Sequence, residues 1–410
     1  MVRSTQSTVM VLSATLVSFV GCSHPKDVAP RSWDAKSAAV YLDQREVAWR
    51  NWPGAARDHG TFCISCHTVL PYVLSRPALR PDVAEQVPSD GELKILTDVR
   101  ERVRLWNQTE PYYKDAGYAD GKPAQPRGTE AVLNALILAN HDAQEKKLSP
   151  ETETAFQIMW ALQQPEGDGR GSWGWLTFGM EPWEANDSAY YGASLAAIAV
   201  GMAPENYRAR PEIQPQLNLL RKYLNRDIKK QSTINRVVLL WAGRKLPGLI
   251  DAEKQATIVK ELRDSQHSDG GWELSSLSWP NDRSLHSLIR SRLRWDWSRQ
   301  DMRSDGYATA LISYVLGQAG LSANDPTLKR GLIWLAQSEN SDGSWPSLSL
   351  IKKRDPSSMT GHFMRDAATA YAVLALTQNK VPSKVESSNL SSQLQPDAQS
   401  TSRPMTGRGR

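Results

Sequence analysis

The chain has 410 residues, of which 40% are hydrophobic and 23% are charged, so it is long enough for one large or two medium-sized cores and is not a fibrous protein. Its formal net charge is +5, from 49 basic and 44 acidic residues, which does not indicate nucleic-acid binding. Fifteen tryptophans against five phenylalanines indicate structural repeats or an aromatic-lined cavity.

The N-terminus has the pattern of an export signal. Residues 1–21 contain one basic residue, Arg3, and an apolar stretch too short to span a bilayer. The sequence Phe19-Val20-Gly21-Cys22 resembles a bacterial lipobox, which implies lipidation of Cys22 and anchoring to a membrane facing the periplasm, and the following Ser23 implies the outer membrane. The alternative is a secreted protein with an unmodified Cys22. A linker over 22–34 is expected to follow.

A short motif downstream combines the other two cysteines with a histidine. Cys63-Ile64-Ser65-Cys66-His67 is C-x-x-C-H, in which two thiols can bond the vinyl groups of one porphyrin while the adjacent histidine binds the iron. We therefore predict one covalent haem c, with thioethers at Cys63 and Cys66 and His67 as proximal ligand. A disulfide between the two cysteines and a zinc site are the alternatives.

Twelve helical segments alternate along the rest of the chain. Six are rich in Ala, Leu and Tyr and start near residues 66, 128, 186, 232, 304 and 365. Six amphipathic partners cover 35–49, 91–106, 150–163, 212–224, 251–264 and 326–336. Because strand-like alternation is scarce, we predict an all-α fold, an α/α toroid of six hairpins over 35–379, followed by a disordered tail over 380–410.

Three of the hairpins carry a similar loop, which spans Gln164–Trp173, Gln266–Trp272 and Gln337–Trp345. These loops resemble the Gln-Trp repeats of the terpenoid cyclase and protein prenyltransferase superfamily, which implies an α/α toroid whose Gln and Trp side chains stabilise adjacent hairpins. The acidic motifs that those cyclases use are absent, since no two aspartates are adjacent. Cyclase activity is therefore not expected.

Alternating hairpins would gather the N-termini of the inner helices at one mouth of the ring, where the helix dipoles favour acceptors. The sequence has polar residues near these N-termini, and we predict that they face the cavity. The alternative is that each of them only caps its helix. The cavity candidates are Glu130, Asp187, Asp305 and Asp366, with Asn235 beside them.

A second iron ligand is expected from the segment before the sixth inner helix, where His362 and Met364 lie. His59, Met180 and a five-coordinate iron are alternatives.

The fifth hairpin contains an extra segment, 279–303, with apolar residues on one helical stripe and arginines beside it. A lid or solvated excursion is the favoured interpretation. Insertion into anionic lipid headgroups is the alternative.

Four possibilities follow from these features, and the last of them is a protein without haem whose ring mediates protein contacts. The leading hypothesis is a redox protein that transfers electrons or oxidises an apolar, isoprenoid-like molecule beside the haem, with a periplasmic redox partner or that small molecule as its partner. The second is a haem-bearing electron carrier or sensor on an inert scaffold. The third is a carbohydrate-active toroid, because tryptophans and paired carboxylates serve sugar binding and glycosidic cleavage.

Overall fold

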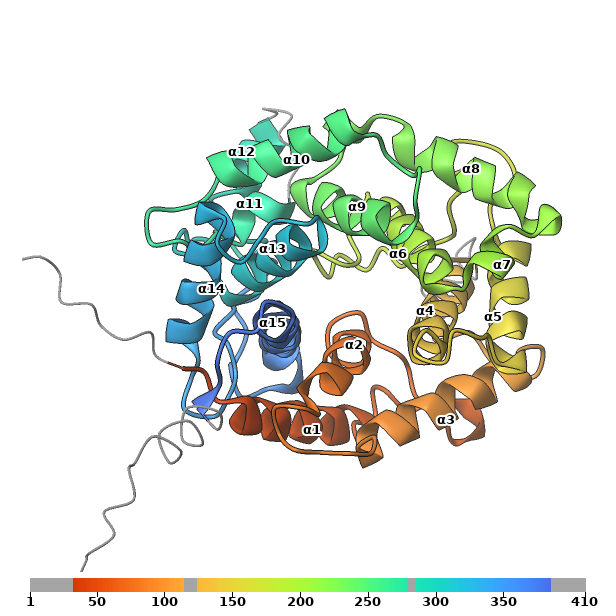
Figure 1. Ribbon diagram of the computed structural model, residues 1–410, viewed down its shortest axis with the longest axis horizontal. Helices are drawn as coiled ribbons and strands as arrows, with labels where there is room; N and C mark the ends of the chain where they lie inside the picture. The colour runs from red at the N-terminus through yellow and green to blue at the C-terminus, as the bar shows by residue number, and fades with distance from the viewer. Residues whose placement is uncertain (1–31, 114–123, 279–284, 385–410) are drawn as a thin grey trace, which may run out of the picture.

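The computed structural model describes residues 32–113, 124–278 and 285–384 and confirms the predicted all-α toroid (Figure 1). Cys22, the signal segment and residues 385–410 lie outside these ranges. Six inner helices surround the centre: α2 (Val69–Leu79), α4 (Ala124–Asp142), α6 (Ser188–Met202), α9 (Thr233–Lys245), α13 (Gly306–Gln318) and α15 (Met359–Gln378). Six outer helices cover them: α1 (Ala35–Arg50), α3 (Asp90–Arg104), α5 (Pro150–Ala161), α8 (Gln214–Asn225), α10 (Ala252–Asp264) and α14 (Pro326–Ser338). Three short helices lie in the loops: α7 (Glu205–Arg208), α11 (Ser275–Ser278) and α12 (Leu285–Arg290).

The composition of each helix explains its layer. The inner helix α6 is made largely of Ala, Gly and Ser and is buried on nearly every side, so its neighbours α4 and α9 pack closely against it. The outer helix α8 instead buries only Leu217, Leu220 and Leu224, which repeat at three- and four-residue steps on one face. None of the helices in the described part of the chain is long and apolar enough to cross a membrane.

The Gln-Trp-type loops make the same contact in three hairpins. Trp173, Trp272 and Trp345 are fully buried, and each donates its indole N–H to a carbonyl near the end of the preceding outer helix, at 2.6 to 2.8 Å. The Gln266 amide also donates to the Thr327 carbonyl at the start of the next outer helix, at 2.9 Å. In the first of these loops the corresponding brace comes from Gln163, which donates to the Gln216 carbonyl at 3.0 Å, and not from the expected Gln164.

The ring closes where the sixth hairpin meets the first. Helix α15 packs against both α1 and α2, so the two ends of the described chain lie side by side (Figure 1). The Asp34 backbone N–H donates to Glu339 at 2.8 Å, and the Trp33 indole donates to the Val381 carbonyl at 3.0 Å. These contacts join segments that are more than 300 residues apart.

One inner helix begins earlier than its sequence pattern predicts. Helix α15 starts at Met359, because the Ser358 hydroxyl caps it by accepting the Gly361 backbone N–H at 3.1 Å. The segment 359–366, which we expected to be a turn, therefore forms the first two helical turns. As a result, Asp366 lies inside the helix and not at its N-terminus.

Candidate functional site

The C-x-x-C-H residues lie in the loop that enters α2, and the protein encloses them. Cys63, Cys66 and His67 are 2%, 3% and 4% exposed. The imidazole stacks on Phe363 with ring centroids 3.6 Å apart, and the edge of Trp49 approaches at 5.0 Å. Burial lowers the pKa of His67 well below its usual range and raises the pKa of the Cys63 thiol to about 11.

This packing does not fit a haem without rearrangement. A porphyrin-sized space beside the two thiols and the imidazole would leave their atoms accessible from inside that space, yet all three residues are almost completely covered. The two expected distal ligands lie in the first turns of α15, where Met364 is buried and His362 Nδ1 lies 3.5 Å from the Tyr41 hydroxyl. Attachment of haem c to Cys63 and Cys66 stays a prediction from the sequence, and it would require these neighbours to move.

The polar residues expected at the ring mouth are engaged in separate contacts. Glu130 is fully buried and forms an ion pair with Arg102 of α3 at 2.5 Å. Asp366 accepts from Arg45 of α1 at 2.8 Å, and Asp187 accepts from Asn235 at 3.0 Å. Since a buried charge requires a partner, each side chain is drawn to the nearest donor and the set does not converge on one point.

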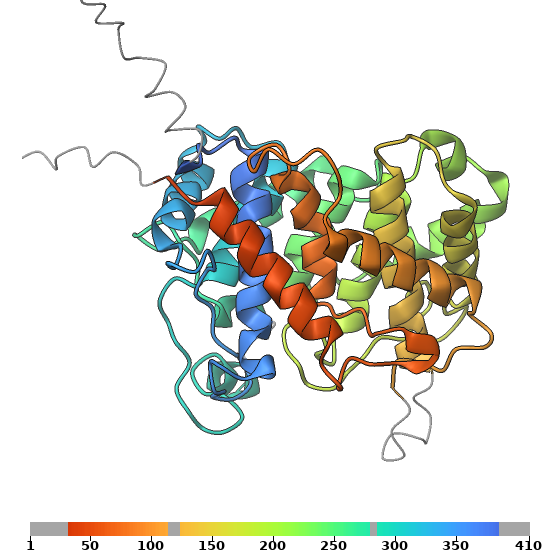
Figure 2. The same ribbon diagram turned by 90° about the horizontal axis from the view of Figure 1, so that it is seen from below.

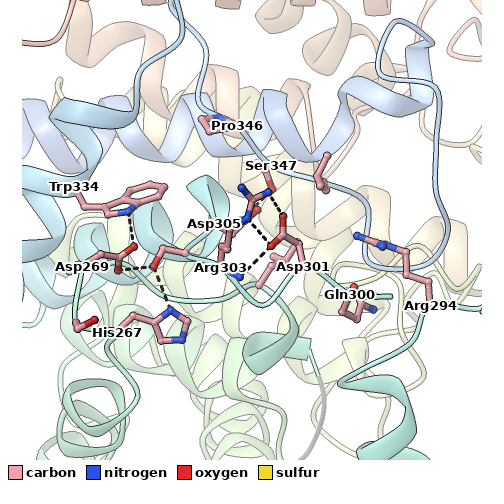
Figure 3. A pocket seen from close by; sticks show the side chains of 14 residues that line it. His267, Asp269, Arg294, Gln300, Asp301, Arg303, Asp305, Trp334, Pro346 and Ser347 are labelled. Atoms are coloured by element: carbon pink, nitrogen blue, oxygen red, sulfur yellow. Dashed lines mark hydrogen bonds and ion pairs between the residues drawn. The ribbon is translucent and has the colours of Figure 1, made fainter. Parts of the chain in front are cut away.

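Asp305, the remaining member of this set, lines a pocket of about 760 Å³ (Figure 3). The pocket lies between the N-terminus of α13, helix α14 and three loops, and its volume suits a small ligand. Its polar lining includes three carboxylates, Asp269, Asp301 and Asp305, with Trp334 at one side. It is lined by His267, Ser268, Asp269, Leu274, Arg294, Gln300, Asp301, Arg303, Ser304, Asp305, Trp334, Pro346, Ser347 and Leu348.

Asp305 is the N-cap of α13. Its Oδ1 accepts the backbone N–H groups of Tyr307 at 2.8 Å and Ala308 at 3.1 Å, together with the Ser347 hydroxyl at 3.0 Å. Removal from water nevertheless outweighs these hydrogen bonds and raises the pKa of Asp305 to about 7. This carboxyl group is therefore able to carry a proton near neutral pH.

The other two carboxylates of the pocket have lowered pKa values, in contrast to Asp305. Burial opposes ionisation of Asp269, but hydrogen bonds from Ser304 at 2.7 Å, the Gly271 backbone and the Trp334 indole together lower its pKa. The bidentate contact with Arg303 lowers the pKa of Asp301. The pocket thus combines one carboxyl group whose pKa is raised to about 7 with two whose pKa values are lowered.

Sequence reasoning found only Asp305 of this group. Asp269 lies inside a loop that the Gln-Trp pattern marks as structural, and Asp301 lies in the extra segment of the fifth hairpin. Trp334 belongs to an outer helix, and no sequence signal distinguishes it from the other fourteen tryptophans. Only the folded ring brings these three segments to one pocket. Within the described residues, no group of three or more His, Cys, Asp or Glu side chains is arranged to hold a metal ion.

Comparison with known proteins gives matches among solved structures alone, since no family model and no curated protein matches the chain. A glycosidase variant of known structure aligns over 85% of this chain and 98% of its own, with 12% identity and a TM-score of 0.46. A possible GH105 family member from Klebsiella pneumoniae aligns over 85% of this chain and 82% of its own, with 12% identity and a TM-score of 0.34. A possible GH105 member from Salmonella enterica aligns with 14% identity and a TM-score of 0.30, over 84% of this chain and 82% of its own.

The expected redox function is wrong. The motif residues pack against aromatic side chains of the core and are almost completely covered, so within the described part of the chain an apolar substrate has no place beside them. We therefore do not propose haem-dependent redox chemistry or electron transfer as the function.

Proposed function

We propose that this protein binds a carbohydrate in the pocket between α13 and α14 and cleaves a glycosidic bond there. The observation that carries the proposal is the presence in one pocket of Asp305, whose pKa burial raises to about 7, and of carboxylates whose pKa values are lowered. Glycoside hydrolysis needs this division of roles, with one acid that protonates the leaving oxygen and one carboxylate that acts as base or nucleophile.

Asp305 takes the role of general acid, and Asp301 that of the carboxylate base. Asp269 is the weaker candidate for the base because it has a structural counterpart. In the next hairpin, Asp342 Oδ1 accepts the Ser344 backbone N–H at 3.1 Å, just as Asp269 Oδ1 accepts the Gly271 N–H at 3.1 Å. That aspartate stabilises the loop turn in both hairpins.

Trp334 is suited to bind the sugar ring. It is partly exposed, lines the pocket and has its indole nitrogen 3.3 Å from Asp269 Oδ2. An indole face provides a large, rigid apolar surface against which a pyranose can pack, while the surrounding Arg, Gln and Ser side chains supply donors for its hydroxyl groups.

The test is hydrolysis of a panel of p-nitrophenyl α- and β-hexosides and hexuronides by the full chain. Asp305→Asn should lower kcat by about 10² to 10⁴ for any substrate turned over, because the amide cannot donate the proton. Asparagine also caps helices well, so the folded state should be retained. The matched control is Asp325→Asn, since Asp325 caps α14 through the same pair of backbone contacts but lies outside the pocket.

The pH profile gives a second readout. The acid must be protonated, so kcat/KM should fall above about pH 7, where Asp305 ionises. The base, Asp301, must be ionised, and its pKa is lowered, so kcat/KM should also fall at acidic pH, where Asp301 becomes protonated. No hydrolysis of any glycoside, or equal losses in the Asp305 and Asp325 variants, would refute the proposal.

We also propose two further properties that the sequence predicts, a relationship to a known superfamily and export with a lipid anchor. The repeated Trp and Gln contacts support a relationship with the Gln-Trp repeats of the terpenoid cyclase superfamily. The signal-like N-terminus supports export and a lipid anchor at Cys22, which would bring the ring to a membrane facing the periplasm.

A further inference from the structure

Four large apolar side chains are exposed on one projecting segment of the fifth hairpin. Leu285, Leu288, Trp295 and Trp297 are 74%, 58%, 53% and 71% exposed. We call residues 285–303, together with the adjoining loop 348–354, the basic lobe. Figure 2 shows its teal part projecting beyond the ring at the end where α15 begins. A folded chain rarely displays several such side chains together without a binding role.

The two tryptophans lie on an ordered turn. The Arg294 backbone N–H donates to the Ser298 carbonyl at 2.8 Å, and the Ser298 side chain donates to Asp296 at 2.6 Å. Trp297 has a φ of 61°, a left-handed conformation that a bulky residue rarely adopts. The guanidinium of Arg290 lies 4.2 Å from the ring centroid of Trp295. The structure therefore fixes these indoles in outward positions and does not leave them on a loose loop.

The charge around these side chains is predominantly positive. Arg292, Arg299, Lys352 and Lys353 are exposed, and within the described chain none of them forms an ion pair. The nearby acids are already bonded, since Asp296 accepts from Ser298 and the Lys353 backbone, and Asp301 accepts from Arg303. The lobe thus presents unpaired cations beside exposed indole and leucine side chains.

We propose that the basic lobe docks the protein on an anionic phospholipid surface. Indole and leucine side chains enter the headgroup region, where amphipathic aromatic rings are stable, and the four exposed cations approach the lipid phosphates. Arg294, Asp301, Arg303 and Leu348 belong both to the lobe and to the pocket, so docking would place the pocket next to the membrane. This inference does not depend on the proposed hydrolase activity.

The test is sedimentation of the full chain with lipid vesicles. The chain should carry Cys22→Ser so that no acyl anchor contributes. Vesicles of phosphatidylcholine are compared with vesicles that also contain phosphatidylglycerol. We expect binding to the anionic vesicles, weak binding to the neutral ones, and a loss of binding as salt concentration rises.

Two variants separate the charge from the apolar side chains. Arg292→Glu with Arg299→Glu should weaken vesicle binding at least about tenfold, because each cation near an anionic surface contributes about that order of affinity. Trp295→Ala with Trp297→Ala should weaken it by a similar factor. Lys146→Glu with Lys147→Glu is the matched control, since it makes the same change of net charge in the loop between α4 and α5.

Unchanged thermal melting would show that the variants fold. Absence of binding to anionic vesicles, or an equal loss in the Lys146 and Lys147 control, would overturn the proposal. Binding to a soluble polyanion such as dextran sulfate without binding to vesicles would overturn it as well and would assign the lobe to an acidic polymer.

Discussion

Cys63 and Cys66 illustrate how the environment of a residue decides its chemistry. Their spacing alone is that of a haem-attachment motif, but in the fold both thiols are buried beside the ring core. Desolvation raises the pKa of both, to about 11 for Cys63. Since the thiolate is the reactive form, both side chains should be unreactive in this packing as long as they carry no haem.

We expect the two thiols to react slowly with iodoacetamide in the folded protein. At pH 8, a pKa raised from 9 to about 11 lowers the thiolate fraction of Cys63 about a hundredfold, so alkylation should be slower by at least that factor than in urea-unfolded protein. Mass spectrometry of the peptide that contains both cysteines measures the rates, with glutathione as the reference thiol. Equal rates in folded and unfolded protein would contradict this prediction. A peptide that carries the mass of a haem would instead support the haem c that the sequence motif predicts.

Each of the three Gln-Trp-type loops contains one glycine that its conformation and packing require. Gly171, Gly270 and Gly343 have φ values of 95°, 97° and 80°, and each lies against the backbone of the next outer helix. A Cβ on Gly343 would overlap the Ser37 backbone, which belongs to α1 at the other end of the chain. Glycine is required there both for the backbone conformation and for the close approach that closes the ring.

Gly343→Ala should therefore destabilise the protein more than a substitution that only strains the backbone. Gly167→Ala is the matched control, because Gly167 has a φ of 70° in a similar loop and has no atom within 4 Å of its Cβ position. We expect a loss of about 1 to 2 kcal/mol for the control and about 3 kcal/mol or more for Gly343→Ala. Urea denaturation measures both, and equal losses would show that the contact with Ser37 adds nothing.

Burial of carboxyl groups makes the stability of the entire ring depend on pH. It raises the pKa values of Asp98 and Asp305 to about 7, and those of Glu181 and Glu184 to about 8. Between pH 6.5 and 8 the folded protein holds protons on these groups that the unfolded chain has already lost. Because the folded state binds more protons, the free energy of unfolding must fall as pH rises through this interval.

The Tm should therefore decrease by several degrees between pH 6.5 and pH 8. Below pH 6.5 the trend is opposed in part by His67 and His362, whose pKa values burial lowers. Because these two groups account for fewer protons than the four carboxyl groups, the free energy of unfolding should continue to rise below pH 6.5, but less steeply. Scanning calorimetry in buffers with small temperature coefficients measures the Tm. Glu184→Gln removes one of the four groups and should make the slope shallower, whereas a Tm that rises toward pH 8 would contradict the linkage.

The all-α toroid, its six hairpins and most helix boundaries could be predicted from the amino-acid sequence. Those features depend on local rules, such as the small-residue inner helices, the amphipathic outer helices and the caps at Ser89, Ser149 and Asp251. The same rules identified Asp305 as a polar residue at an inner-helix start. They placed the start of α15 too late, because the Ser358 cap was not recognised.

Which polar residues share a site could not be predicted in this way, because it depends on contacts between distant segments. Asp269, Asp301 and Trp334 are brought together with Asp305 by ring closure and loop packing, which no local pattern encodes. The pKa values that divide the carboxyl groups into one acid and two carboxylates depend on burial and on hydrogen bonds within the folded pocket. The same holds for the C-x-x-C-H motif: its spacing is a property of the chain, but the space around its side chains is set by Phe363 and Trp49, which belong to other helices.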